Sequence, residues 1–196
     1  MKLTRKILIN LYVNKKLSCA EIAKSHNCSP QKVDYWLKKF HIPKRSISEA
    51  IYARHNPKGD PFSIRYPQTI TEGILYGMGF GLYWGEGNKK DKASIRLGNT
   101  DPNLVKKFIE FLEKFFLINK KKLKFGLQIF NDMKKKDSLL FWRKKLQVGP
   151  EQFQKVIITP SRGEGTYREK SKYGVLTVYF NNKKLKGYFC KRIESI

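Results

Sequence analysis

The segment 73–87, with the sequence GILYGMGFGLYWGEG, constrains the fold of this chain more than any other. It is apolar from residue 74 to residue 84 and then reaches one acid, Glu86. Three of its glycines recur every four residues: Gly77, Gly81 and Gly85. In a helix they share one face and leave it without side chains. Because each interior glycine destabilises a helix by about 1 kcal/mol relative to alanine, we expect a close backbone approach that requires them.

A membrane-spanning helix needs roughly 20 apolar residues, and this apolar run is too short. Stripes of small residues pack helix pairs together in membranes. We therefore expect two soluble helices that pack backbone to backbone, with the dimer interface at Gly77, Gly81 and Gly85. Glu86 then lies at the end of the pair. An acid at a helix C-terminus opposes the helix dipole, which hints at a bound cation.

The net charge of +25 on 196 residues indicates a polyanionic partner. Nucleic acid is the expected one, and no basic amphipathic helix or lipidation motif supports a membrane. The hydrophobic fraction of 40% favours a folded chain with one or two small domains. The three cysteines form no CxxC pair, and the N-terminus does not resemble a secretory signal. We expect a cytoplasmic, nucleoid-associated protein.

Residues 1–45 predict a helix-turn-helix DNA-binding domain. Ser18 and Glu21 form a capping box, and Ser29–Pro30 starts a further helix after a tight turn. The leucine-serine-x-x-glutamate-isoleucine-alanine pattern at 17–23 resembles the helix-turn-helix signature. The residues expected at DNA are Gln31, Lys32, Asp34, Tyr35, Lys38, Lys44 and Arg45. A helical bundle that binds protein is the alternative. Histidine and cysteine spacing here matches no zinc pattern.

Residues 46–69 predict a basic linker interrupted by prolines, in which residues 48–54 could form one or two helical turns. Two interpretations stay open for it: a solvated tether, or a basic arm that follows DNA between two docked domains.

Residues 70–196 alternate helical and strand patterns, so we predict an α+β domain. The expected helices are about 71–85, 103–116, 138–146 and 181–193, and the expected strands are 93–97, 123–130, 154–159 and 174–180. A four-stranded sheet with helices on one face uses every segment. Its open face would carry Ser94, Arg96, Lys124, Gln128 and Thr177, and could contact DNA. Lys134 and Lys135 belong to a basic loop that contacts DNA or is solvated.

The segment 79–87 resembles the LAGLIDADG motif of homing endonucleases. Segments 97–101, 141–142 and 152–153 follow in the order seen in many members, so the likeness covers about residues 70 to 196. It implies a LAGLIDADG-type saddle. With one motif per chain, it also implies a homodimer that binds a (pseudo)palindromic double-stranded DNA site.

The resemblance also implies an activity: double-strand DNA cleavage with a divalent metal, Mg²⁺. The last acid of the motif maps to Glu86, and the Gly85 carbonyl would be a second metal ligand. Gln128 and Lys172 are proposed as auxiliary catalytic residues. Trp84 stands where the family often has an earlier acid, and we expect it in the core rather than stacked on a base.

Two alternatives stay open. Some relatives with helix-turn-helix units are transcriptional regulators that bind DNA without cutting it. Others bind intron RNA as splicing maturases, which makes structured RNA a further partner to consider.

Overall fold

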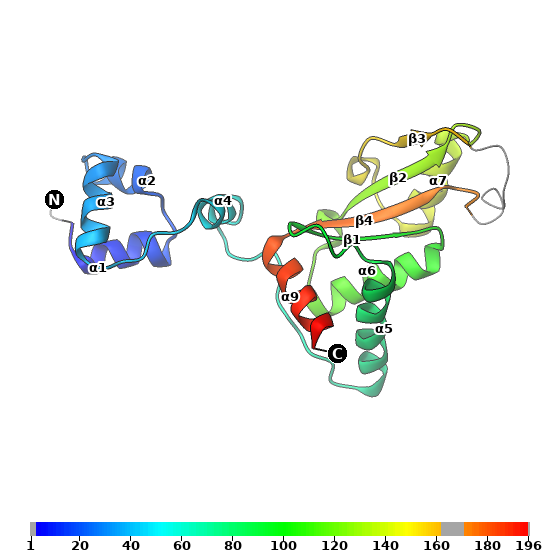
Figure 1. Cartoon of the computed structure of the whole chain (residues 1–196), viewed down its shortest axis with the longest axis horizontal. Helices are drawn as coiled ribbons and strands as arrows, with labels where there is room; N and C mark the ends of the chain where they lie inside the picture. The colour runs from blue at the N-terminus through cyan, green and yellow to red at the C-terminus, as the bar shows by residue number, and fades with distance from the viewer. Residues whose placement is uncertain (1–2, 162–170, 196) are drawn as a thin grey trace. The chain divides into compact units, whose positions relative to one another are not determined.

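The computed structural model describes residues 3–161 and 171–195. The chain divides into two compact units, Met1–Pro61 and Phe62–Ile196 (Figure 1). Each unit has its own hydrophobic core. Within the described ranges, no helix is long and apolar enough to cross a membrane.

The first unit contains short helices around a small core. Their bounds are α1 Arg5–Leu8, η1 Ile9–Asn14, α2 Cys19–Ser25, α3 Pro30–Lys39 and α4 Ile47–His55. The capping box at Ser18, the Ser29 cap of α3 and the left-handed backbone of Asn27 (φ 50°) are confirmed. The first helical segment differs from the expected single α-helix, because α1 widens into the π-helix η1.

The stretch that the sequence marks as a linker contains regular structure. Ser46 and Glu49 cap α4, whose side chains are all at least partly exposed. From Phe62 the chain belongs to the second unit, where the amides of Ser63 and Arg65 bond to carbonyls of helix α6.

The second unit is α+β, as expected. Its elements are α5 Ile70–Glu86, β1 Ser94–Asn99, α6 Pro102–Phe116, η2 Lys120–Lys122, β2 Lys124–Phe130, α7 Lys135–Leu146, η3 Pro150–Gln152, β3 Ile157–Thr159, β4 Val175–Asn181 and α9 Lys183–Glu194. The four strands form one mixed sheet in the order β1-β4-β2-β3. The β1–β4 and β4–β2 pairs are antiparallel, and β2–β3 is parallel.

Alternation along the strands gives the sheet two different faces. Ile95, Phe125 and Val178 point into the core with the buried aromatic residues of α5, α6 and α9. The residues between them, such as Arg96 and Lys124, lie on the open face. Period-two alternation predicts this division because one strand face meets the helices and the other meets solvent.

Helix α5 packs on α6 through one of its glycines. A Cβ at Gly79 would lie 2.1 Å from the ring of Phe111, so only glycine fits there. Phe80 and Tyr83 extend the same buried face toward α9. The opposite face of α5 is therefore left for another contact.

Candidate nucleic-acid interface and cation site

The exposed face of α5 carries the glycine stripe. A Cβ added at Gly77, Gly81 or Gly85 would meet no atom within 4 Å. Large apolar side chains flank these glycines and are also exposed: Ile70 at 86%, Ile74 at 61%, Met78 and Trp84. An exposed apolar helix face on which glycines leave room for close contact is typical of a surface that another molecule covers.

The expectation that Trp84 lies in the core is wrong for the isolated chain, because 57% of its surface is exposed. Core positions on α5 fall at Tyr76, Phe80 and Tyr83, whose spacing turns Trp84 away from α6 and α9. The period of the buried residues decides the direction, not the size of the side chain.

Glu86 ends α5 and is exposed. Across the described ranges, its carboxylate forms no hydrogen bond or ion pair with the chain. The ammonium of Lys89 donates instead to the Trp84 carbonyl, one of the last carbonyls of the helix. The carboxylate of Glu86 is therefore free to bind a cation.

The donors at this helix end suit one kind of metal. No cluster of three or more histidine, cysteine, aspartate or glutamate side chains occurs in the part of the chain that the structure describes. A single carboxylate with a neighbouring carbonyl fits Mg²⁺, which keeps several waters and takes its remaining oxygens from phosphates.

The backbone after Glu86 runs directly alongside β1. Gly87 forms a β-bridge with Leu97, and the Asn88 amide donates to the Arg96 carbonyl at 3.0 Å. Gly87 has extended backbone (φ −78°, ψ 147°), so it does not end the helix as a left-handed cap. It is glycine for a steric reason, since a Cβ there would lie 2.4 Å from the Tyr83 ring.

One row of the open sheet face is organised before any ligand binds. Arg96, Tyr179 and Lys124 are neighbours across β1, β4 and β2. The Tyr179 ring lies over Gly126, where a Cβ would come within 2.8 Å of it. The guanidinium of Arg96 sits 5.2 Å from the centre of that ring, and this arrangement favours a cation–π contact.

A carboxylate holds Arg96 from the side. Asp91 Oδ2 is 2.7 Å from the Arg96 guanidinium and accepts from Ser94 Oγ at 2.6 Å. Hydrogen bonds from Ser94 and the Ala93 amide lower the pKa of Asp91, and Arg96 lowers it further. These contacts restrict the conformations of the Arg96 side chain before any ligand binds. Tyr179 is not among the residues expected at DNA, although its place between the core residues Val178 and Phe180 predicts that it lies on the open face.

The two auxiliary residues lie away from Glu86 of the same chain. Gln128 is on the open face of β2, opposite Val175 and Ile157. Lys172 is exposed and lines an open hollow beside α7, together with Lys134 and Tyr173. Lys135 is the first residue of α7, so the expectation that it belongs to a loop is wrong, because the helix begins before residue 138. No described contact joins Gln128 or Lys172 to Glu86.

On the first unit, Gln31, Lys32, Tyr35 and Lys38 are exposed on α3. Asp34 lies among them and pairs with Lys44 at 2.5 Å and with Lys38 at 3.4 Å. The contact with Lys44 is the largest of the effects that lower the pKa of Asp34. Part of the positive charge near α3 is therefore already neutralised within the unit.

Arg45 serves the fold of this unit. Its guanidinium donates to the Lys16 carbonyl at 2.8 Å and the Leu17 carbonyl at 2.5 Å, and it lies 4.3 Å from the centre of the Tyr12 ring. These contacts tie the segment after α3 to the turn before α2, which sequence spacing did not indicate.

Comparison of the chain with protein-family models, curated proteins and solved structures finds no match.

Proposed function

We propose that this chain is a homodimeric, sequence-specific double-strand DNA endonuclease of the LAGLIDADG type, with a divalent cation held at Glu86. The observation that carries the proposal is the α5 face, where an open glycine stripe ends at a carboxylate without a partner. A contact between two copies of α5 along this face would explain both the open glycines and the position of Glu86.

We expect a dimer because the three glycines lower the stability of helix α5. Gly77, Gly81 and Gly85 each weaken α5 by about 1 kcal/mol relative to alanine. Among the residues that the structure describes, packing requires none of the three to be glycine, unlike Gly79. In a two-fold dimer, α5 of one subunit would pack against α5 of the other, and all three glycines would lie in that interface. This is because a two-fold interface pairs a surface with itself.

Two-fold symmetry would also set the form of the target. Each subunit would present Arg96, Tyr179 and Lys124 on its sheet and α3 on its helix-turn-helix. The expected site is therefore a (pseudo)palindromic duplex. The net charge of +25 supports binding to its phosphates.

In the proposed reaction Glu86 binds a cation beside the scissile phosphate, with the Gly85 carbonyl as a second protein ligand. A divalent cation supplies an activated water and stabilises the leaving oxygen when it is bound there. The chain itself would place the Glu86 carboxylate at the dimer interface. Lys124 and Arg96 would hold the duplex so that the scissile phosphate lies next to that carboxylate. Gln128 and Lys172 are proposed to act around the attacking water.

The second candidate is a DNA-binding regulator that does not cut. The small donor set favours it, since one chain offers a single carboxylate at this helix end. Such a protein would use the same dimer and the same basic surfaces in the cytoplasm, at the nucleoid. Structured RNA is a third ligand that the same charge would attract.

The two candidates are separated by selecting a binding site from a random duplex library and placing it in a supercoiled plasmid. With Mg²⁺, the wild-type protein should convert the plasmid to linear DNA. Glu86→Gln should bind the site within about twofold of wild type and leave the plasmid intact. Tight binding by both proteins with no cleavage by either would establish the regulator. Preference for a structured RNA competitor over the selected duplex would argue against both.

A further inference from the structure

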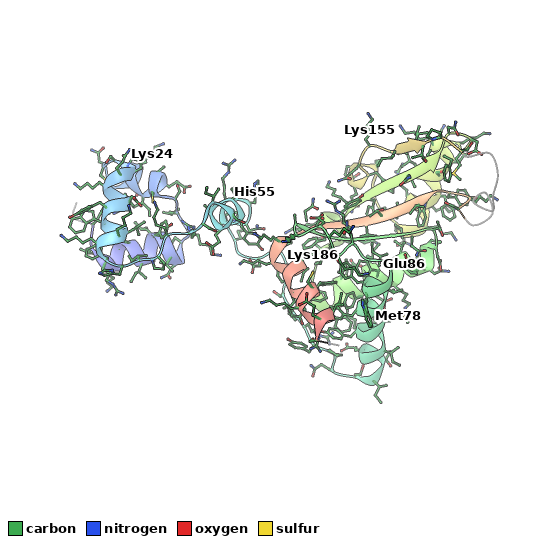
Figure 2. All side chains as sticks on the ribbon, viewed as in Figure 1. Lys24, His55, Met78, Glu86, Lys155 and Lys186 are labelled. Atoms are coloured by element: carbon green, nitrogen blue, oxygen red, sulfur yellow. The ribbon has the colours of Figure 1, made fainter. Side chains whose placement is uncertain are left out.

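Lys186 of α9 is buried deep in the second unit, with 1% of its surface exposed. Its ammonium is 2.6 Å from the Tyr83 hydroxyl and also donates to the Asn88 carbonyl. It lies 5.1 Å from the centre of the Tyr83 ring. Figure 2 labels Lys186 on α9 and Glu86 at the end of α5 that is nearer the sheet.

Among the described residues no carboxylate lies within ion-pair distance of this lysine, and Asp91 interacts with it only over a longer distance. Burial of an ammonium without a carboxylate in contact is unfavourable by several kcal/mol unless its hydrogen bonds are excellent. If position 186 served only to fill the core, a leucine or methionine would be sufficient there. The position of Lys186 therefore requires another explanation.

Its hydrogen bonds form a closed triangle with Tyr83 and Asn88. The Tyr83 hydroxyl donates its one proton to the Asn88 carbonyl at 2.8 Å, so its oxygen is left to accept from Lys186. The Asn88 carbonyl thus receives two donors.

The triangle fixes the turn that follows Glu86. Gly87 lies against the Tyr83 ring and donates to the Tyr83 carbonyl at 2.9 Å. The Asn88 carbonyl accepts a hydrogen bond from Lys186, and the Asn88 amide donates one to the Arg96 carbonyl. The backbone is therefore fixed immediately after Glu86, while the carboxylate itself is left without a partner.

We infer that Lys186 is a positioning residue for Glu86. Its bonds to Tyr83 and Asn88 hold the turn that follows Glu86, and thereby the helix end whose Glu86 carboxylate and Gly85 carbonyl would bind a divalent cation. The inference rests on the proposed nuclease function and assigns to α9 a part in the cation site. Residues that orient metal ligands in this way typically change metal affinity about 10- to 100-fold when they are removed.

The test compares Lys186→Met and Tyr83→Phe with Lys191→Met, an exposed lysine of the same helix. Backbone hydrogen exchange is measured by NMR on the full chain without metal. Mn²⁺ binding is then followed by electron paramagnetic resonance on the protein bound to its selected duplex, with Glu86→Gln as reference.

In Lys186→Met and Tyr83→Phe, exchange at Gly87 and Asn88 should be at least about tenfold faster, while exchange in β2 stays unchanged. The dissociation constant for Mn²⁺ should rise about tenfold or more. Lys191→Met should match wild type in both measurements. Wild-type Mn²⁺ affinity in Lys186→Met would overturn the inference.

A failure of the proposed function would look different. If Glu86→Gln and wild type bind Mn²⁺ identically, the cation site is wrong, and the assignment of Lys186 to it is wrong as well. Exchange at Gly87 and Asn88 would still decide whether Lys186 holds the turn.

Discussion

The guanidinium of Arg96 lies 5.2 Å from the centre of the Tyr179 ring, and that ring covers the backbone of Gly126. Three strands contribute to this stack, and Asp91 holds Arg96 from the side. An arginine that is ordered in advance loses little side-chain entropy on binding. We therefore expect this pair to discriminate between bases, whereas freely moving lysines contact phosphates.

Replacing Arg96 with lysine should separate charge from shape. Lysine keeps the positive charge but loses the planar fork that bonds two atoms of a guanine edge. Affinity for the selected duplex should fall by about 1–3 kcal/mol, or roughly 5- to 150-fold. Affinity for a scrambled duplex should stay within about twofold. Fluorescence anisotropy at one fixed salt concentration measures both, and an equal loss on both duplexes would assign Arg96 to phosphate contact.

Gly79→Ala should destabilise the second unit, because its Cβ would enter the buried Phe111 ring. Overpacking of this kind lowers the free energy of unfolding by about 1–3 kcal/mol. Gly187 of α9 is the matched control, since a Cβ there meets no atom within 4 Å. Gly187→Ala should raise stability by up to about 1 kcal/mol through helix propensity. Urea unfolding gives both values, and equal stability of the two variants would contradict the packing of α5 on α6.

Gly81→Leu should abolish the dimer without unfolding the chain. The leucine side chain projects from the open face of α5, where it would separate two helices that meet backbone to backbone. Gly187→Leu adds the same side chain on an exposed position outside this face. Sedimentation velocity should give a monomer for the first variant and a dimer for the second. A dimeric Gly81→Leu with wild-type affinity would place the subunit contact elsewhere.

Glu72 should make stability depend on pH in the acid range. Its carboxylate accepts from the Gln68 amide at 2.8 Å and from Arg65 at 2.9 Å, and it pairs with Lys114. These contacts, the Gln68 bond first, lower the pKa of Glu72 from 4.5 to about 2.

Because the folded pKa is below the unfolded one, this stabilisation is fully present above about pH 4.5 and is lost as the pH falls toward 2. The melting temperature of wild type should therefore drop more steeply over this interval than that of Glu72→Gln. Parallel curves for the two proteins from pH 5 to pH 2 would show that Glu72 does not have this role.

Much of the second unit could be predicted from periodicity. The helix expected at 103–116 and the strand expected at 123–130 differ from α6 and β2 by one residue at one end. Strong amphipathic patterns and a cap at Asp101 explain this agreement. The strand expected at 154–159 begins only at Ile157, because Phe153 and Gln154 make separate contacts with β2.

The site could be predicted less well, for reasons that concern tertiary contacts. Sequence spacing does not distinguish Gly79, which packs on Phe111, from Gly81, which is open. It also could not foresee that Arg45 would bond to carbonyls 28 and 29 residues away. Lys186 looked like one lysine among many in a basic helix, and only the folded chain places its ammonium on Tyr83 and Asn88.

In the proposed dimer, each of the two copies of Glu86, one from each subunit, serves one DNA strand. The most direct measurement joins a wild-type subunit and a Glu86→Gln subunit in one heterodimer and follows a plasmid that carries the selected site. With Mg²⁺ we expect nicked circles from the heterodimer, linear DNA from wild type and no cleavage from the dimer in which both subunits carry Glu86→Gln. Linear DNA formed by the heterodimer at the wild-type rate, or no cleavage by wild type despite tight binding, would contradict this proposal.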